Sequence, residues 1–66
     1  MRYFEKRKGN ETLILAQDDR GDYSVASNLD PDPDGFVGPS DAFARGYNET
    51  TRERATEVLG YDPEEN

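Results

Sequence analysis

The sequence contains no cysteine, no histidine and no tryptophan. Without cysteine the chain cannot form a disulfide, and without cysteine and histidine it lacks the usual ligands of zinc and copper. The longest apolar run is Leu13 to Ala16, whereas a membrane-spanning helix needs about 20 apolar residues. The N-terminus also lacks the apolar stretch of a signal peptide. These absences predict a soluble, cytoplasmic protein that uses neither soft metals nor a membrane.

Hydrophobic residues are also scarce. They make up 32% of the 66 residues against 35% charged residues, and the mean hydropathy is -1.10. A chain of this length buries only about 60% of the surface that its unfolded form exposes. The apolar residues nevertheless fall in short periodic runs, so we expect residues 1–66 to form a single small acidic domain with a modest core.

Charge is unevenly distributed along the chain, whose net charge is -7. Residues 1–9 carry four cations against one acid and are net positive by 3. Residues 10–41 carry eight acids against one arginine, net -7, and residues 42–66 carry six acids against three arginines, net -3. Such a chain favours basic partners and repels nucleic acid.

Three stretches in the first part of the sequence have the character of strands. RYFEKRK (residues 2–8) and TLILAQ (residues 12–17) are separated by Gly9-Asn10, a pair that suits a tight hairpin turn. YSVAS (residues 23–27) follows the polar DDRGD and alternates its side chains between two faces. The sequence therefore predicts a three-stranded antiparallel meander over residues 1–27.

The rest of the chain is predicted to be a loop followed by a helix. Residues 28–39 hold three of the four prolines and should form an acidic Pro/Gly loop without strand pairing. Residues 40–61 should be helical, either as a short turn plus a helix that starts at a Thr50–Glu53 capping box, or as one bent helix. Gly60 should end the helix after Leu59, and residues 62–66 should fray. The predicted class is α+β, with the order β-β-β-α and the C-terminal helix packed on the sheet.

The stretch DPDPDGFVGPSD, residues 30–41, resembles the calcium loop of the EF-hand family over these twelve residues only. It departs from that family because two prolines stiffen the turn, an aspartate replaces the last glutamate, and no helix precedes it. Prolines push the residues before them toward extended backbone, which points successive carboxylates apart. We therefore predict that the protein has no cofactor, and calcium is the alternative. The metal ligands would be Asp30, Asp32, Asp34 and Asp41.

The sequence offers little for catalysis, so we predict no catalytic residue and no enzyme activity. Its serines have no base near them except carboxylates, and a domain of this size can hardly form the cleft that a carboxylate pair needs. The basic first strand interleaves aromatic residues with cations, which suits nucleic acid, but the overall charge opposes such binding. A basic edge strand is more simply a guard against edge-to-edge pairing.

The leading hypothesis is a non-enzymatic acidic module that docks on a basic surface of a larger protein, one that normally holds nucleic acid, as an inhibitor or antitoxin. DDRGDYSV and the later TTRERATEVL resemble small antitoxins of the HicB type, which carry an acidic sheet-and-helix domain, although no diagnostic motif of that family is present. Two alternatives stay open, namely a calcium module and a salt-adapted domain whose acidity serves no partner. The predicted partner-binding residues are Asp18, Asp19, Asp22, Asp30, Asp32, Asp34, Glu49, Glu53 and Glu57.

Overall fold

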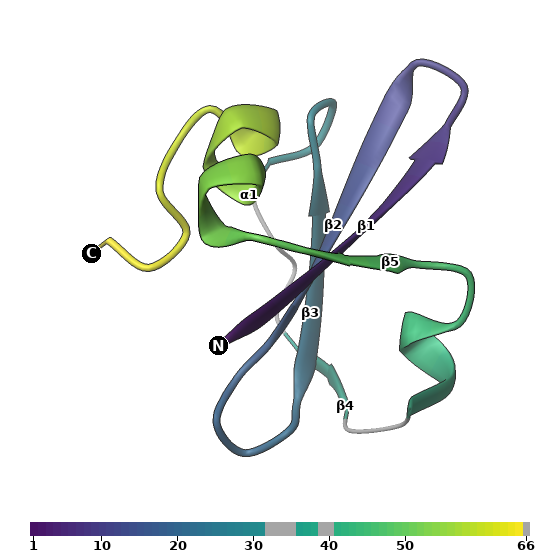
Figure 1. Ribbon diagram of the computed structural model, residues 1–66, viewed down its shortest axis with the longest axis vertical. Coiled ribbons are helices and arrows are strands. Elements are labelled where there is room, and N and C mark those ends of the chain that lie inside the picture. The colour runs from purple at the N-terminus through teal and green to yellow at the C-terminus, as the bar shows by residue number, and fades with distance from the viewer. Residues whose placement is uncertain (32–35, 39–40, 66) are drawn as a thin grey trace.

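Figure 1 shows a twisted antiparallel sheet with one helix beside it. The structure is a computed structural model that describes residues 1–31, 36–38 and 41–65. It confirms the predicted α+β class and the antiparallel meander at the start of the chain. The elements in chain order are β1 (Arg2–Lys8), β2 (Glu11–Gln17), β3 (Tyr23–Ser27), β4 (Phe36–Gly38), the 3-10 helix η1 (Asp41–Ala44), β5 (Asn48–Thr50) and α1 (Arg52–Leu59).

The hairpin between β1 and β2 turns at the two residues that the sequence marks. Gly9 has a φ of +62°, while Asn10 has no positive φ, as in a type II′ turn. Lys8 faces Glu11 beside the turn, and the pairing continues without a shift along all seven residues of each strand. Alternate side chains of β1 and β2 therefore lie on opposite faces of the sheet.

The sequence-based prediction misses two strands of three residues each, β4 and β5. They lie at the two edges of the sheet, whose order is β4-β3-β2-β1-β5. β4 falls inside the loop predicted to be unpaired (residues 28–39), and β5 falls inside the segment predicted to be helical (residues 40–61). Both strands are too short to show a period of their own. Each forms because β3 or β1 would otherwise leave N–H and C=O groups of a strand edge without partners.

The N-cap of α1 lies one residue later than predicted. Thr51, and not Thr50, is the N-cap, and its hydroxyl accepts a hydrogen bond from the backbone N–H of Arg54 at 3.1 Å. The predicted reciprocal capping box is wrong, because the third helical residue is then an arginine instead of Glu53. The predicted stop is confirmed, since Gly60 has a φ of +83° and its N–H bonds the carbonyl of Thr56. Within the described ranges, no helix is long and apolar enough to cross a membrane.

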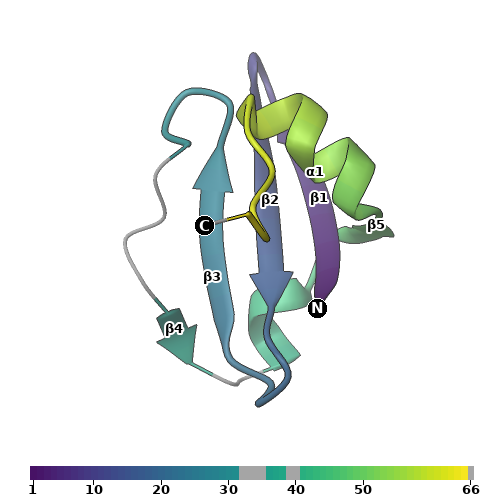
Figure 2. The same cartoon turned by 90° about the vertical axis from the view of Figure 1, so that its left-hand side faces the viewer.

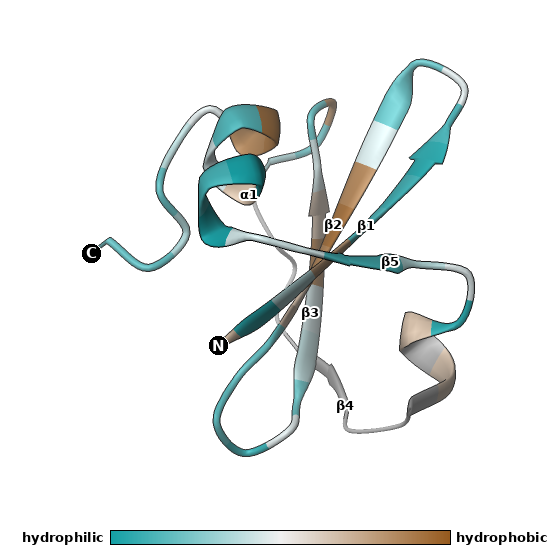
Figure 3. Cartoon of the chain, in the orientation of Figure 1, coloured by the Kyte–Doolittle hydropathy of each residue, from teal (hydrophilic) through white to brown (hydrophobic). Residues whose placement is uncertain are grey.

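The sheet has a small core on each face. We call the side covered by α1 the helix face and the side covered by η1 the turn face (Figures 1 and 2). Figure 3 shows the apolar residues concentrated where the central strands cross. The helix-face core consists of Tyr3, Ile14, Ala55 and Leu59, with Ala16, Ala26 and Val58 packed against it. The turn-face core consists of Phe4, Leu15 and Tyr23, with Val25, Ala44 and Tyr47 packed against it.

The C-terminal residues 62–66 are predicted to fray, whereas the structure shows residues 62–65 against the body of the domain. The chain reverses at Gly60, and the Tyr61 hydroxyl then donates a hydrogen bond to the carbonyl of Pro31 at 2.6 Å. Farther on, the Tyr3 hydroxyl donates to the Glu64 carboxylate at 2.6 Å. This tail therefore crosses the helix face and forms part of its surface.

Candidate interaction surface

Asp18 builds the turn between β2 and β3. Its Oδ1 accepts hydrogen bonds from the backbone N–H groups of Arg20 and Asp22, each at 2.9 Å. Burial opposes ionisation of this carboxyl, but these hydrogen bonds and the charge of Arg20 hold its pKa below the ordinary value. The carboxylate of Asp18 is thus occupied inside the turn, and its role is to display the residues that follow.

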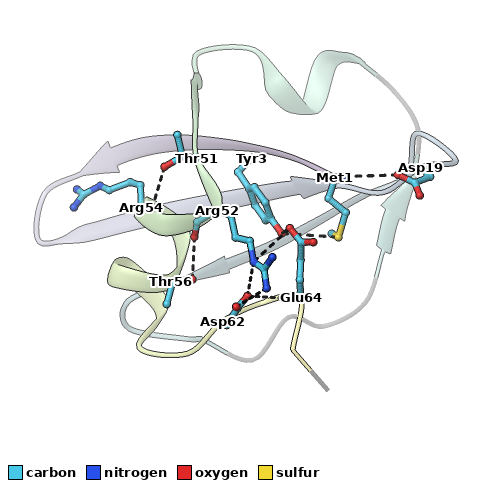
Figure 4. Close-up of polar contacts among 9 residues, drawn as sticks. All are labelled: Met1, Tyr3, Asp19, Thr51, Arg52, Arg54, Thr56, Asp62 and Glu64. Atoms are coloured by element: carbon cyan, nitrogen blue, oxygen red, sulfur yellow. Dashed lines mark hydrogen bonds and ion pairs between the residues drawn. The ribbon is translucent and has the colours of Figure 1, made fainter.

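Asp19 and Asp22 are displayed by that turn. The side chain of Asp19 is 97% exposed and lies 3.7 Å from the amino group of Met1. The carboxylate of Asp22 has no hydrogen-bond partner or ion pair among the residues that the structure describes. Figure 4 shows Asp19 and Glu64 on either side of Met1. We call Asp18, Asp19, Asp22 and Glu64 together the acidic end.

Glu64 belongs to the acidic end and Asp62 lies beside it, although the sequence-based list of partner residues omits both. Arg52 at the start of α1 binds Asp62 through two hydrogen bonds of 2.6 and 2.9 Å and lies 3.8 Å from Glu64 (Figure 4). The hydrogen bond from Arg52 lowers the pKa of Asp62. A signal for this placement was present in the sequence, because a glycine-capped helix followed by Asp62-Pro63 reverses the chain toward the helix start.

Glu49 and Glu57 already bind arginines of the same chain. Glu49 on β5 accepts hydrogen bonds of 3.0 and 3.2 Å from Arg2, which lower its pKa. Arg54 binds Glu57 at 2.7 Å on α1 and also contacts Glu5 on β1 at 3.2 Å. These pairs fasten β5 and α1 to the sheet, so a partner would have to compete with an internal cation for both carboxylates.

Glu53 and Asp30 are exposed, and neither carboxylate has a partner within the described part of the chain. Glu53 lies in the first turn of α1, where the helix dipole favours an acid. Asp30 lies far from the acidic end, because the Leu13–Ser27 pair and the Gln17–Tyr23 pair are four positions apart along β2. At about 3.4 Å per residue, that separation is about 14 Å. The predicted acids therefore do not form one continuous patch.

The predicted calcium loop cannot be built from the described residues. Asp32 and Asp34 lie outside them, and of Asp41 only the backbone, at the start of η1, is described. Among the residues that are described, no group of three or more acids is arranged to hold a metal ion. Whether the loop binds calcium stays a prediction.

Ser27 and Glu11 form the one serine–carboxylate hydrogen bond in the described part, at 2.7 Å. Ser27 is only 2% exposed, and its oxygen already accepts the backbone N–H groups of Leu29 and Asp30. A substrate could not reach a hydroxyl oxygen that is buried and hydrogen-bonded in this way. The pair closes the turn after β3, and its geometry favours a structural role.

Three of the four cations of β1 lie away from the acidic end. Lys6, Arg7 and Lys8, which we call the basic arm, are exposed on the distal half of the β1–β2 hairpin (Figure 1). Lys6 lies 5.8 Å from the centre of the Tyr47 ring, while Arg7 and Lys8 have no ion pair with any described residue. Lys8 is five residues along β1 from Tyr3, or about 17 Å at the usual rise.

The helix face contains a small apolar groove between the sheet and the tail. Its volume is about 80 Å³. The floor is made by Ile14, Ala16, Ser24 and Ala26, and the walls include Tyr61 and Pro63. Ala16 faces Ser24 across β2 and β3, and Ala26 faces Ile14, so three of the four side chains of the floor are small.

Comparison of the chain with protein-family models, with curated proteins and with solved structures found no match. The similarity to HicB-type antitoxins therefore stays a resemblance over two short stretches. What this surface does has to be argued from its own geometry.

Proposed function

We propose that this chain is a non-enzymatic interaction module that docks its acidic end on a basic surface of a larger protein, as an inhibitor or antitoxin-like modulator. The observation that carries the proposal is the separation of charge along the sheet. Exposed carboxylates lie at one end of β1, and the exposed cations of the basic arm lie at the other.

This separation orients the docking as well as attracting the partner. A basic surface attracts Asp19 and Asp22 and repels Lys8, so the acidic end approaches first and the hairpin points away. Like-charge contacts cost enough to suppress wrong orientations. A protein surface that normally holds nucleic acid is a fitting partner, because its cations are already arranged to meet closely spaced negative charges.

The internal ion pairs support the same division of roles. Asp18, Glu49 and Glu57 stabilise the turn, β5 and α1, whereas Asp19 and Glu53 are exposed and Asp22 is partly exposed. The available acids are therefore carried on elements that other acids hold in place. This arrangement spares the contact surface from reorganising on binding.

The test is capture of partner proteins from a lysate of the source cells, at 0.1 M and at 1 M salt. The Debye length falls from about 10 Å to about 3 Å over that range, so binding through exposed acids should be strongly reduced. Asp19→Asn with Asp22→Asn should reduce capture at low salt. The matched control, Arg7→Gln with Lys8→Gln, also removes two charges and should preserve or increase capture.

Equal capture at both salts, with no effect of the Asp19 and Asp22 substitutions, would contradict the proposal. The acidity would then serve hydration of the surface, as in a salt-adapted protein. A purified partner would sharpen the result, because the loss should be mainly in the association rate.

A further inference from the structure

The apolar groove on the helix face lies next to the acidic end. Glu64, which accepts the Tyr3 hydroxyl, and the amino-terminal Met1 lie at its border, and Met1 in turn contacts Asp19. Figure 2 shows the tail passing over β2, with β3 beside it. Apolar floor and carboxylates thus form one continuous surface.

The dimensions of the groove define what it can hold. A volume of about 80 Å³ exceeds the space that a single water needs, which is about 10–15 Å³ on the same scale. An engineered apolar cavity of about 150 Å³ holds benzene, so a groove about half as large suits an aliphatic side chain better than an aromatic ring. Water in it meets mostly carbon, and its release on binding is favourable.

The rim of the groove is suited to cations. Tyr61, which is 39% exposed, lies at this rim, and its hydroxyl donates a hydrogen bond to the carbonyl of Pro31. The nearby cations are the Met1 amino group, Arg20 and Arg52. The Met1 amino group faces Asp19, Arg20 lies 3.6 Å from Asp18, and Arg52 faces Asp62 and Glu64. An incoming cation therefore meets the carboxylate oxygens of Asp19 and Glu64, and it shares them with the Met1 amino group and Arg52.

We infer that the groove binds an extended basic segment of the partner protein, which inserts one aliphatic side chain over Ala16, Ser24 and Ala26 and places lysine or arginine beside Glu64 and Asp19. The inference rests on the proposed function and adds the site and the chemistry of the partner. Electrostatic attraction selects a basic partner and brings it to the acidic end. The inserted aliphatic side chain then fixes the position of the segment along the groove.

The experiment uses three synthetic peptides, KKLKK, KKSKK and EELEE, and follows backbone and methyl chemical shifts of the protein during titration. KKLKK should shift the methyl groups of Ala16 and Ala26 and bind roughly tenfold or more tightly than KKSKK, because burying a leucine side chain is worth at least that much. EELEE should not bind.

Two variants of one position provide the matched control. Ser24→Ile fills the groove from its floor, and Ser24→Ala leaves it open with the same strand backbone. The preference for KKLKK over KKSKK should disappear in S24I and persist in S24A. If S24I does not fold, the wild-type protein and S24A still decide the matter through the two lysine peptides.

The failures are distinguishable. Equal binding of KKLKK and KKSKK, with shifts only at Asp19 and Asp22, would overturn the groove and leave the proposed docking through charge intact. No binding of either lysine peptide would overturn both. Shifts at Ala16 and Ala26 that grow with protein concentration alone would show that a second copy of the chain occupies the groove, which also overturns the inference.

Discussion

The two faces of the sheet are covered in different ways. On the helix face, Ala55 is fully buried and Leu59 is 8% exposed beneath a capped helix. On the turn face, Ala44 and Tyr47 are only partly buried and come from η1 and the residues after it. Polar pairs from Arg52, Arg54 and Tyr3 fasten the helix-face cover, whereas on the turn face, among the described side chains, Tyr47 of the cover contacts Lys6 of the sheet.

The difference suggests where the domain opens first. Regions with few buried apolar contacts open locally at a lower free energy than the core. We therefore expect the described part of the turn-face cover, residues 44–47, to open more readily than α1. The following predictions test that ranking, beginning with the largest expected change in the free energy of unfolding.

Ile14 and Leu15 are neighbours on β2 that point to opposite faces, and each is 2% exposed. Truncation of either to alanine should cost about 2–5 kcal/mol. The cost of Ile14→Ala should be near the upper end of this range and that of Leu15→Ala near the lower end. The irregular cover of the turn face can collapse into the cavity that the truncated Leu15 leaves. Urea unfolding measures both, with Ile14→Val as a milder control. A larger loss for Leu15→Ala would reverse the ranking of the faces.

Gly60 and Gly46 have the same φ of +83°, one after α1 and the other after η1. Alanine in this left-handed conformation costs about 1–2 kcal/mol. Gly60→Ala should show that full cost in the free energy of unfolding. Gly46→Ala should show less, because opening of the turn-face cover relieves the strain without unfolding the rest. Equal costs in thermal or urea unfolding would mean that the two covers unfold as one unit.

Thr51 caps α1, and its removal tests only the helix face. Thr51→Ala should cost about 1 kcal/mol, since the N–H of Arg54 loses its acceptor. Thr51→Ser keeps the hydroxyl and should recover most of the loss. Circular dichroism during urea titration measures both variants. An unchanged stability in Thr51→Ala would show that packing of Ala55 and Leu59 alone defines the helix start.

The smallest effect is confined to alkaline pH. Burial, followed by the hydrogen bond to Glu64, raises the pKa of Tyr3 well above its ordinary value of 10.0. The folded state then keeps a proton that the unfolded state releases, so stability falls as the pH rises above the unfolded pKa. Tyr3→Phe should show a shallower loss of stability above pH 10, measured by urea unfolding at several pH values.

The turn face supplies the control for this titration. Burial and the charge of Glu11 also raise the pKa of Tyr47. If the turn-face cover opens locally, Tyr47 can release its proton without global unfolding. Tyr47→Phe should then change the dependence of the free energy of unfolding on pH above 10 less than Tyr3→Phe does. The reverse order would place the weaker cover on the helix face.

Sequence patterns of a few residues correctly predicted the strands of the meander, its first turn and the end of the helix. The alternation of Tyr23, Val25 and Ser27, the Gly9-Asn10 turn and the Gly60 stop each specify structure within a few residues. β4 and β5 could not be predicted in this way, because their pairing depends on strand edges elsewhere in the chain. The helix start was missed by one threonine, since Thr50 and Thr51 both suit a cap and only pairing of Thr50 with Tyr3 decides between them.

The sequence predicted which acids the candidate surface contains, but not which of their carboxylates are already bound by other residues of the chain. Sequence singled out Glu49 and Glu57 alongside Asp19, but it could not show that Arg2 would reach Glu49 from 47 residues away. It also missed Glu64, because a polar C-terminus looks unstructured until Tyr3 offers a hydroxyl. Ion pairs between distant residues are properties of the folded chain, and they separate structural acids from available ones.

The position of β1 between β2 and β5 has a consequence for the order of folding. β1 meets β2 across a two-residue turn, a loop that closes at little entropic cost, whereas its pairing with β5 joins Tyr3 to Thr50 across most of the chain. Contacts between residues far apart in sequence slow folding, because the chain is ordered before they stabilise it. The meander can therefore form early as a nucleus, and closure of β5 on β1, with α1 following directly after it, is the late step that completes the domain.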